Sequence, residues 1–268
     1  DARWRLYLLS PRVLGAYGYR RRYHGITLDP YKKATRLVRA ALKGGNRLTR
    51  DALYKVLVKG GVPSDKGLGL HILGRLALEQ LICFGPREGK QHTFVLFDER
   101  VPQGKQFTRE QALRELTIRY FRSHGPAQIQ DFAWWSGLRV SDIRVGIELA
   151  GSALRQELIE GVAYYTGKDT ALKREVDQAY LLPPFDEYVV SYKDRSAVLE
   201  AVHAQHVNPG ANGMLSAVVV IGGQLVGTWK RTIKKDFVTV RPTPFISFTR
   251  DQKKMIETAA AHYQAFFK

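Results

Sequence analysis

The pattern of apolar and polar positions is most regular in the middle of the chain, where it predicts a helix with a clear start and stop. Thr108 and Gln111 have the spacing of a capping box, a side-chain arrangement that opens many helices. Apolar residues then recur every three or four positions, which places them on one helical face. The helix should end at the Gly125-Pro126 break, because proline cannot continue helical hydrogen bonding.

Two shorter helices are predicted after this break. The first carries Phe132, Trp134 and Trp135, and we expect both tryptophans in a hydrophobic core rather than stacked on nucleobases. Gly137 supplies a left-handed turn, and Ser141 is expected to cap the third helix. The apolar face of that helix contains Ile143, Ile147 and Ala150.

A β-hairpin is predicted next. Residues 158–165 form a hairpin pattern around Glu160-Gly161, a pair that favours a tight turn. Three helices followed by a hairpin are the element order of a winged helix, and helix-turn-helix units of this kind commonly bind DNA.

The same order of elements is predicted earlier in the chain. Apolar residues 34–42 follow helical spacing and stop at Gly44-Gly45. Thr49 is placed to cap a short helix that ends near Val58. Strands should flank the loop at 85–91 as a second hairpin. Between them, a third helix is marked by Leu70, Leu73, Ala77 and Leu81.

Beyond Tyr180 the pattern predicts mostly β-structure, with a turn at Gly222-Gly223. A second capping box, Thr249 and Gln252, predicts a terminal helix that packs on the sheet. The strands are expected within residues 181–196, 215–221 and 225–232.

Together these patterns predict an α+β fold, with tandem winged helix-turn-helix domains followed by a β-rich C-terminal domain and a terminal helix. A connecting helix is expected at 171–179. The predicted boundaries are 1–28 for the remnant of an upstream helical domain, 29–104 and 105–168 for the two winged helices, and 169–268 for the β-rich domain.

The charge of the chain indicates the kind of partner. Lys and Arg number 42 against 25 Asp and Glu, a formal net charge of +17, and such a field attracts polyanions. Nucleic acid is favoured over an anionic membrane surface, because the cations are spread along the chain and no basic amphipathic anchor stands out. No apolar run approaches the roughly 20 residues of a membrane helix. We expect a cytoplasmic monomer without membrane contact.

Cofactors and metals have little support. Cys83 is the only cysteine, which excludes an intramolecular disulfide, and its apolar neighbours predict a buried side chain. His203 and His206 lie three apart, but no nearby Cys or third His completes a zinc set, so we expect solvated histidines. Phosphate-binding glycine fingerprints are missing from the sequence. We expect no cofactor.

Four blocks resemble the AlkZ-type winged-helix DNA glycosylases. They follow the family's order over nearly the whole chain and are Leu81–Glu99, Arg119–Leu138, Leu181–Ser196 and Val226–Thr232. The resemblance implies tandem winged helices and a β-rich domain that cradle double-stranded DNA. It also implies excision of alkylated or crosslinked bases by hydrolysis of the N-glycosidic bond.

The resemblance assigns no catalytic residue to this chain. The family's catalytic pattern, Gln, an aliphatic residue, then Gln or Asp, lies upstream of anything that aligns here, and we expect it to precede Asp1. Gln128-Ile129-Gln130 has the same residue pattern but lies at the start of a later helix. We interpret it as a chance match, and we expect Asp186-Glu187, before a predicted strand, to cap or to form ion pairs.

The DNA-contact candidates are cations at predicted wings, helix ends and strand ends. Three lie in or beside the first hairpin loop: Arg87, Lys90 and His92. Two border the expected recognition helix: Arg139 and Arg144. Four are expected at strand ends: Lys193, Arg195, Lys230 and Arg231. The alternatives are a non-enzymatic winged-helix transcriptional regulator, which would use the same helices, and an RNA-binding or assembly module.

Overall fold

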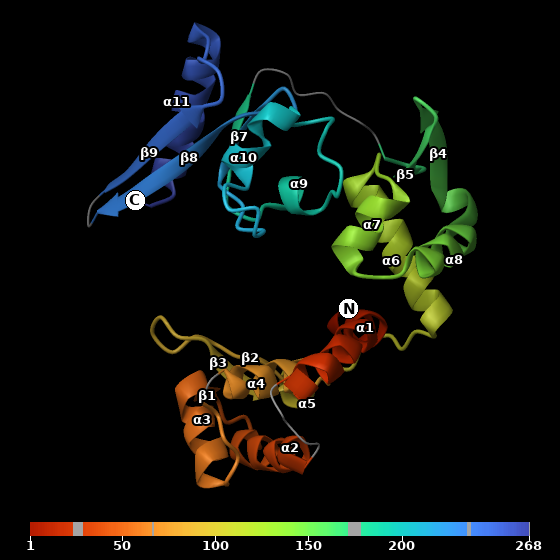
Figure 1. Ribbon diagram of the computed structural model, residues 1–268, viewed down its shortest axis with the longest axis vertical. Coiled ribbons are helices and arrows are strands. Elements are labelled where there is room, and N and C mark those ends of the chain that lie inside the picture. The colour runs from red at the N-terminus through yellow and green to blue at the C-terminus, as the bar shows by residue number, and fades with distance from the viewer. Residues whose placement is uncertain (24–28, 66, 171–177, 235–236, 268) are drawn as a thin grey trace. The chain divides into compact units, whose positions relative to one another are not determined.

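The computed structural model describes the chain except for residues 24–28, 66, 171–177, 235–236 and 268 (Figure 1). Within the described residues the fold is α+β, as expected, with three small antiparallel sheets and a terminal helix. The chain divides into two compact units. The first is Asp1–Arg119 with Gly137–Gly151, and the second is Tyr120–Ser136 with Ser152–Lys268.

The first unit begins with helices and a small sheet in the order β1-β3-β2. Its elements are α1 (Ala2–Tyr23), α2 (Asp29–Leu42), β1 (Leu48–Thr49), α3 (Arg50–Lys59), α4 (Leu68–Leu78), β2 (Ile82–Phe84), β3 (Thr93–Leu96) and α5 (Phe97–Arg100). The helices α2 to α4 and the β2–β3 pair agree with the sequence patterns. Strand β1 was not predicted, because two residues are too few to show a periodicity.

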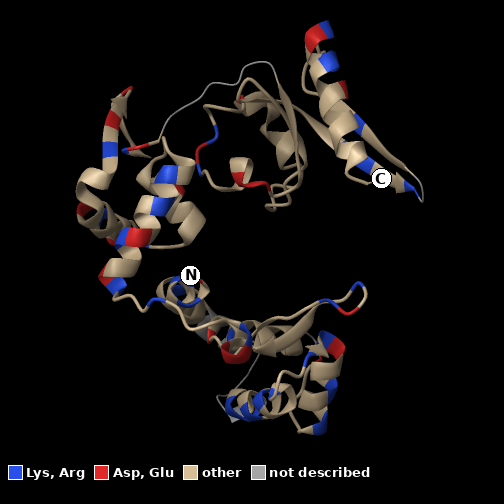
Figure 2. Cartoon of the chain, turned by 180° about the vertical axis from the view of Figure 1, so that it is seen from behind, with Lys and Arg blue, Asp and Glu red and all other residues tan. Residues whose placement is uncertain are grey.

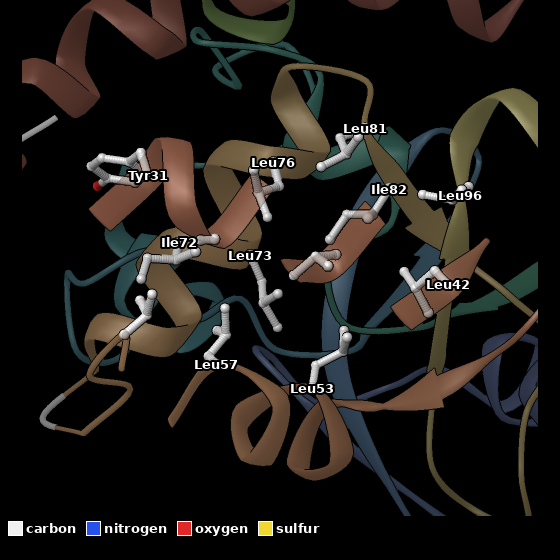
Figure 3. Packing of buried hydrophobic residues seen from close by; sticks show 13 residues of the cluster. Tyr31, Leu42, Leu53, Leu57, Ile72, Leu73, Leu76, Leu81, Ile82 and Leu96 are labelled. Carbon is white, nitrogen blue, oxygen red and sulfur yellow. The ribbon is translucent and has the colours of Figure 1, made fainter. Parts of the chain in front are cut away.

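A hydrophobic cluster holds α2, α3, α4, β2 and β3 together (Figure 3). The inner faces of α2, α3 and α4 meet there, and Ile82 and Leu96 of the sheet close the cluster. Leu42, Leu53 and Ile72 are 0% exposed. Burying each such side chain stabilises the folded state by about 1.5–3 kcal/mol.

Two expectations for this region have different outcomes. Thr49 caps α3, since its Oγ1 accepts a hydrogen bond from the Ala52 N–H at 3.3 Å. Cys83 is half-buried rather than buried. Neighbouring residues of a strand point to opposite faces, and in β2 Ile82 takes the buried face.

The first unit also holds the start of α6 (Arg109–His124) and all of α8 (Val140–Ala150). The predicted capping box opens α6: the Thr108 N–H donates to Gln111 Oε1 at 2.9 Å, and the Gln111 N–H donates to Thr108 Oγ1 at 3.2 Å. Ser141 does not cap α8. The extended backbone that precedes the helix is that of Arg139, so the helix begins earlier and Ser141 lies within its first turn.

The second unit begins with the end of α6 and then contains α7 (Ile129–Ser136), β4 (Leu154–Ile159) and β5 (Val162–Gly167). The strands form the predicted hairpin, with Glu160 and Gly161 at φ values of 50° and 78° in its turn. Trp134 does not join a core, since it is 57% exposed while Phe132 fills the buried face of α7 at 0%.

The rest of the second unit is a four-stranded antiparallel sheet in the order β6-β7-β8-β9, with short helices and a terminal helix (Figure 1). Within β7, Val218 and Val220 pack toward Val189 of α9, whereas Val219 packs with Ile256 of α11 on the opposite face. The elements are β6 (Ala179–Leu182), α9 (Glu187–Val190), η2 (Ala201–His203), α10 (Ala204–Val207), β7 (Val218–Ile221), β8 (Gln224–Lys234), β9 (Phe237–Pro244) and α11 (Arg250–Ala265).

This region corrects part of the β prediction. The segment after Asp186 is the helix α9 and not a strand, because the Asp186 carboxylate accepts a hydrogen bond from the Tyr188 N–H at 2.9 Å and caps it. Strand β9 was not predicted. Residues 171–177 of the expected connecting helix lie outside the described residues, and Ala179 begins β6. The capping box that opens α11 is present as expected.

Candidate nucleic-acid interface

The first group of cations lies on the loop between β2 and β3 (Figure 2). Arg87, Lys90 and His92 are all exposed, and Glu88 pairs with Gln91 to close the loop tip. The His92 ring packs against Phe84, with 4.9 Å between ring centroids. The loop therefore presents its cations to solvent on a short ribbon.

The second group lies at the start of α8. Arg139 and Arg144 are exposed, and Arg139 lines a hollow of about 460 Å³ in the first unit. Arg12 and Arg109 line the same hollow, and Asp142 is the acidic residue among them. Since Arg109 already pairs with Asp142 at 2.9 Å, the hollow keeps a positive charge that suits an anion.

Lys193 and Arg195 lie in the loop that follows α9, which corrects their expected place at a strand end. Lys193 is exposed. Arg195 is half-buried, and its Nε donates to the carbonyl oxygen of Val189 at 2.6 Å. Burial lowers the pKa of the Arg195 guanidinium, and the nearby Asp131 carboxylate opposes this shift.

Lys230 and Arg231 lie within β8, where adjacent residues point to opposite faces. Arg231 donates to the Tyr263 hydroxyl of α11 and lies over the Phe267 ring at 6.0 Å. Lys230 lies directly opposite Arg241 of β9. Like charges in this register repel, so an anion near them would be stabilising.

The candidates divide between the two units, and the structure brings them together only in small groups. Five belong to the first unit: Arg87, Lys90, His92, Arg139 and Arg144. Four belong to the second unit: Lys193, Arg195, Lys230 and Arg231.

The sequence patterns missed a polar cluster that fixes the loop after α9. Asp131 of α7 is buried at 3% exposure, and its Oδ1 accepts hydrogen bonds from the N–H groups of Lys193 at 2.9 Å and Asp194 at 3.3 Å. Its Oδ2 accepts from the Gln128 N–H at 2.9 Å. The sequence does contain one signal for this cluster: Asp131 lies three residues after Gln128 at the start of a helix, a spacing at which a carboxylate can accept a backbone hydrogen bond.

A second part of this cluster involves Glu187. Its Oε2 accepts a hydrogen bond from Ser191 Oγ and another from Trp135 Nε1 at 3.0 Å, and it lies 3.5 Å from His124 Nε2. These contacts, that of Ser191 first, hold the pKa of Glu187 below its ordinary value. The expected capping role is therefore confirmed for Asp186, whereas Glu187 is held by hydrogen bonds.

Three further expectations concern a metal site, a membrane-spanning helix and the segment Gln128-Ile129-Gln130. Within the described ranges no cluster of three metal-ligating side chains occurs, and His203 stacks on Phe245 at 4.9 Å. None of the described helices has the length and apolarity to cross a membrane. Gln128 Nε2 donates to the Tyr164 hydroxyl at 3.2 Å, and Gln130 is exposed in the first turn of α7.

Comparison with known proteins identifies the family. The model of the family described as DNA glycosylase AlkZ-like matches residues 1–266. The chain belongs to the AlkZ-like DNA glycosylase family. It is 28% identical over 255 residues to the interstrand DNA cross-link repair glycosylase of Streptomyces sahachiroi, a match that covers 90% of this chain and 67% of that protein.

A solved AlkZ structure supports the same assignment. The Streptomyces sahachiroi DNA glycosylase AlkZ is similar with a TM-score of 0.76 and 26% identity, over 96% of this chain and 72% of that one. Membership of the AlkZ-like family implies a DNA substrate.

Proposed function

We propose that this chain forms the duplex-binding part of a DNA glycosylase that removes alkylated or crosslinked bases by hydrolysis of the N-glycosidic bond. The similarity to a cross-link repair glycosylase over 90% of the chain carries this proposal. The net charge of +17 supports a polyanionic substrate.

The proposed architecture has two winged-helix modules, at 29–104 and 105–168, followed by a β-rich domain at 169–268. Both modules contain three helices followed by a hairpin, which supports this division. The β2–β3 loop would act as one wing, and α8 as a recognition helix whose cations contact phosphates. The protein would work in the cytoplasm as a monomer without a cofactor.

The chemistry requires a polar pair that orients a water molecule beneath the sugar and stabilises an oxocarbenium-like transition state. We assign this role to no residue of the chain.

The proposal is tested in two steps. The 268-residue chain is titrated with labelled duplexes of two unrelated sequences in dilute salt, and we expect similar affinities that fall steeply with added salt. A duplex that carries one alkylated base should bind more tightly than its unmodified form. Absence of duplex binding contradicts the proposal, and strong preference for one unmodified sequence indicates a transcriptional regulator instead.

A further inference from the structure

The second unit contains a small cavity beside Arg195. It has a volume of about 200 Å³ and lies among the end of α6, the start of α7, β5 and the loop after α9. It holds several water volumes of roughly 30 Å³ and is smaller than most ligand pockets, so it suits one planar ring system. Its lining includes Gln128, Tyr164, Tyr188, Tyr192, Asp194 and Arg195.

The three tyrosines are fixed by their hydroxyl groups. The Tyr188 hydroxyl donates to the carbonyl oxygen of Gly223 at 2.7 Å, and the Tyr192 hydroxyl donates to that of His124 at 2.8 Å. The Tyr164 hydroxyl accepts from Gln128 at 3.2 Å. Because these hydroxyls are already engaged, the rings chiefly offer the cavity aromatic carbon surface, on which a planar ring can stack.

Arg195 provides the polar part of the cavity. Its Nε is held by the Val189 carbonyl, whereas its Nη1 and Nη2 form neither a hydrogen bond nor an ion pair with any residue that the structure describes. Partial burial of a cation is costly, and the nearby Asp131 carboxylate, which also lines the cavity, offsets part of this cost. Asp194 stands beside Arg195 as an acceptor for N–H groups of the same ligand.

We infer that this cavity receives a nucleobase that has been turned out of the DNA stack, with its ring against the tyrosines and an acceptor edge on Arg195. This inference rests on the proposed function. A free phosphate fits less well, because Arg195 is the single Lys or Arg that lines the cavity among the described residues, and two carboxylates, Asp131 and Asp194, line it as well. Since we assign no water-orienting pair to this site, it would hold a base and not cleave its bond.

The test uses the 268-residue chain and two duplexes that differ only in whether a 2-aminopurine is paired or bulged. Wild-type protein should prefer the bulged duplex and quench its fluorescence, because the base stacks on the tyrosines. Arg195→Met should reduce this preference by at least about tenfold, the effect of removing a hydrogen bond from a charged donor. Lys193→Met is the matched control: it removes the same charge two positions away and should weaken both duplexes equally.

A second variant keeps the test informative if Arg195→Met does not fold. Ala197 is exposed at the cavity, so Ala197→Leu fills space without removing a charge and should abolish the preference equally well. Equal binding of both duplexes by the wild type, or an unchanged preference in Arg195→Met and Ala197→Leu, overturns the base pocket and leaves the proposed function intact. A wild type that binds neither duplex overturns both. Suppression of the preference by millimolar inorganic phosphate with the fluorescence unquenched would identify an anion site and also overturn the base pocket.

Discussion

The backbone N–H of Lys193 donates a hydrogen bond to Oδ1 of Asp131 at 2.9 Å, across a separation of 62 residues. This bond fixes the loop after α9 to the start of α7. The loop carries two of the proposed DNA contacts, Lys193 and Arg195. A buried carboxylate therefore sets the position of cations that it does not pair with directly.

Asp131→Asn should destabilise the second unit. Both Asp131 oxygens accept hydrogen bonds from backbone N–H groups, and an asparagine would turn an NH₂ group toward one of these donors. We expect a loss of about 1–3 kcal/mol in the free energy of unfolding, the cost of leaving a buried polar group unsatisfied. Urea denaturation measures it, with Asp169→Asn, whose side chain is 80% exposed, as control. Equal midpoints for the two variants would contradict the anchoring role.

Protonation of Glu187 should make the folded protein less stable in acid. Its pKa is lowered in the folded state, chiefly by the hydrogen bond from Ser191, so its contribution is present above the ordinary value of 4.5 and is lost as the pH falls through the folded value. Glu187→Gln should narrow the difference in melting temperature between pH 6 and acid by a small amount, since the carboxylate is 67% exposed. Glu257→Gln, on the exposed side of α11, should leave the wild-type profile unchanged.

Replacing Lys90 and Arg144 by Ala should weaken duplex binding at every sequence. Two lost phosphate contacts reduce the slope of log affinity against log salt by roughly 1.8. Fluorescence anisotropy at several salt concentrations measures this slope. A control variant with Lys253→Ala and Lys254→Ala, exposed at the start of α11, has the same net charge and should retain the wild-type slope. A retained slope in the first variant would exclude these two residues from the interface.

Gly146→Ala should loosen the packing of α8 on α6 in the first unit. A Cβ atom at Gly146 would lie 2.2 Å from Thr117 Oγ1, and Thr117 is fully buried. Overpacking of this kind costs about 1–3 kcal/mol in the free energy of unfolding. Thermal unfolding with Gly104→Ala as control, where an added Cβ meets nothing within 4 Å, distinguishes this effect from the general effect of replacing a glycine by alanine. A melting temperature equal to that of the control would contradict the close approach.

The sequence by itself determined the local features of this protein. Capping boxes at Thr108 and Thr249 and the turn at Glu160-Gly161 depend on residues only a few positions apart, so their side chains and backbone preferences suffice to predict them. The strongly basic character is likewise a property of composition. The order of the four blocks that resemble AlkZ-type glycosylases also predicted the correct family.

Only the tertiary structure decided which distant residues meet. Asp131 lies 62 residues from Lys193, and the cavity beside Arg195 is lined by three separate segments, so no local periodicity could reveal either. The exposure of Trp134 was mispredicted for the same reason, whereas the helix at Glu187–Val190 begins at a local cap from Asp186 that the strand prediction overlooked. Propensity describes what a segment prefers in isolation, whereas burial and hydrogen bonding to other segments determine what it does in the folded chain.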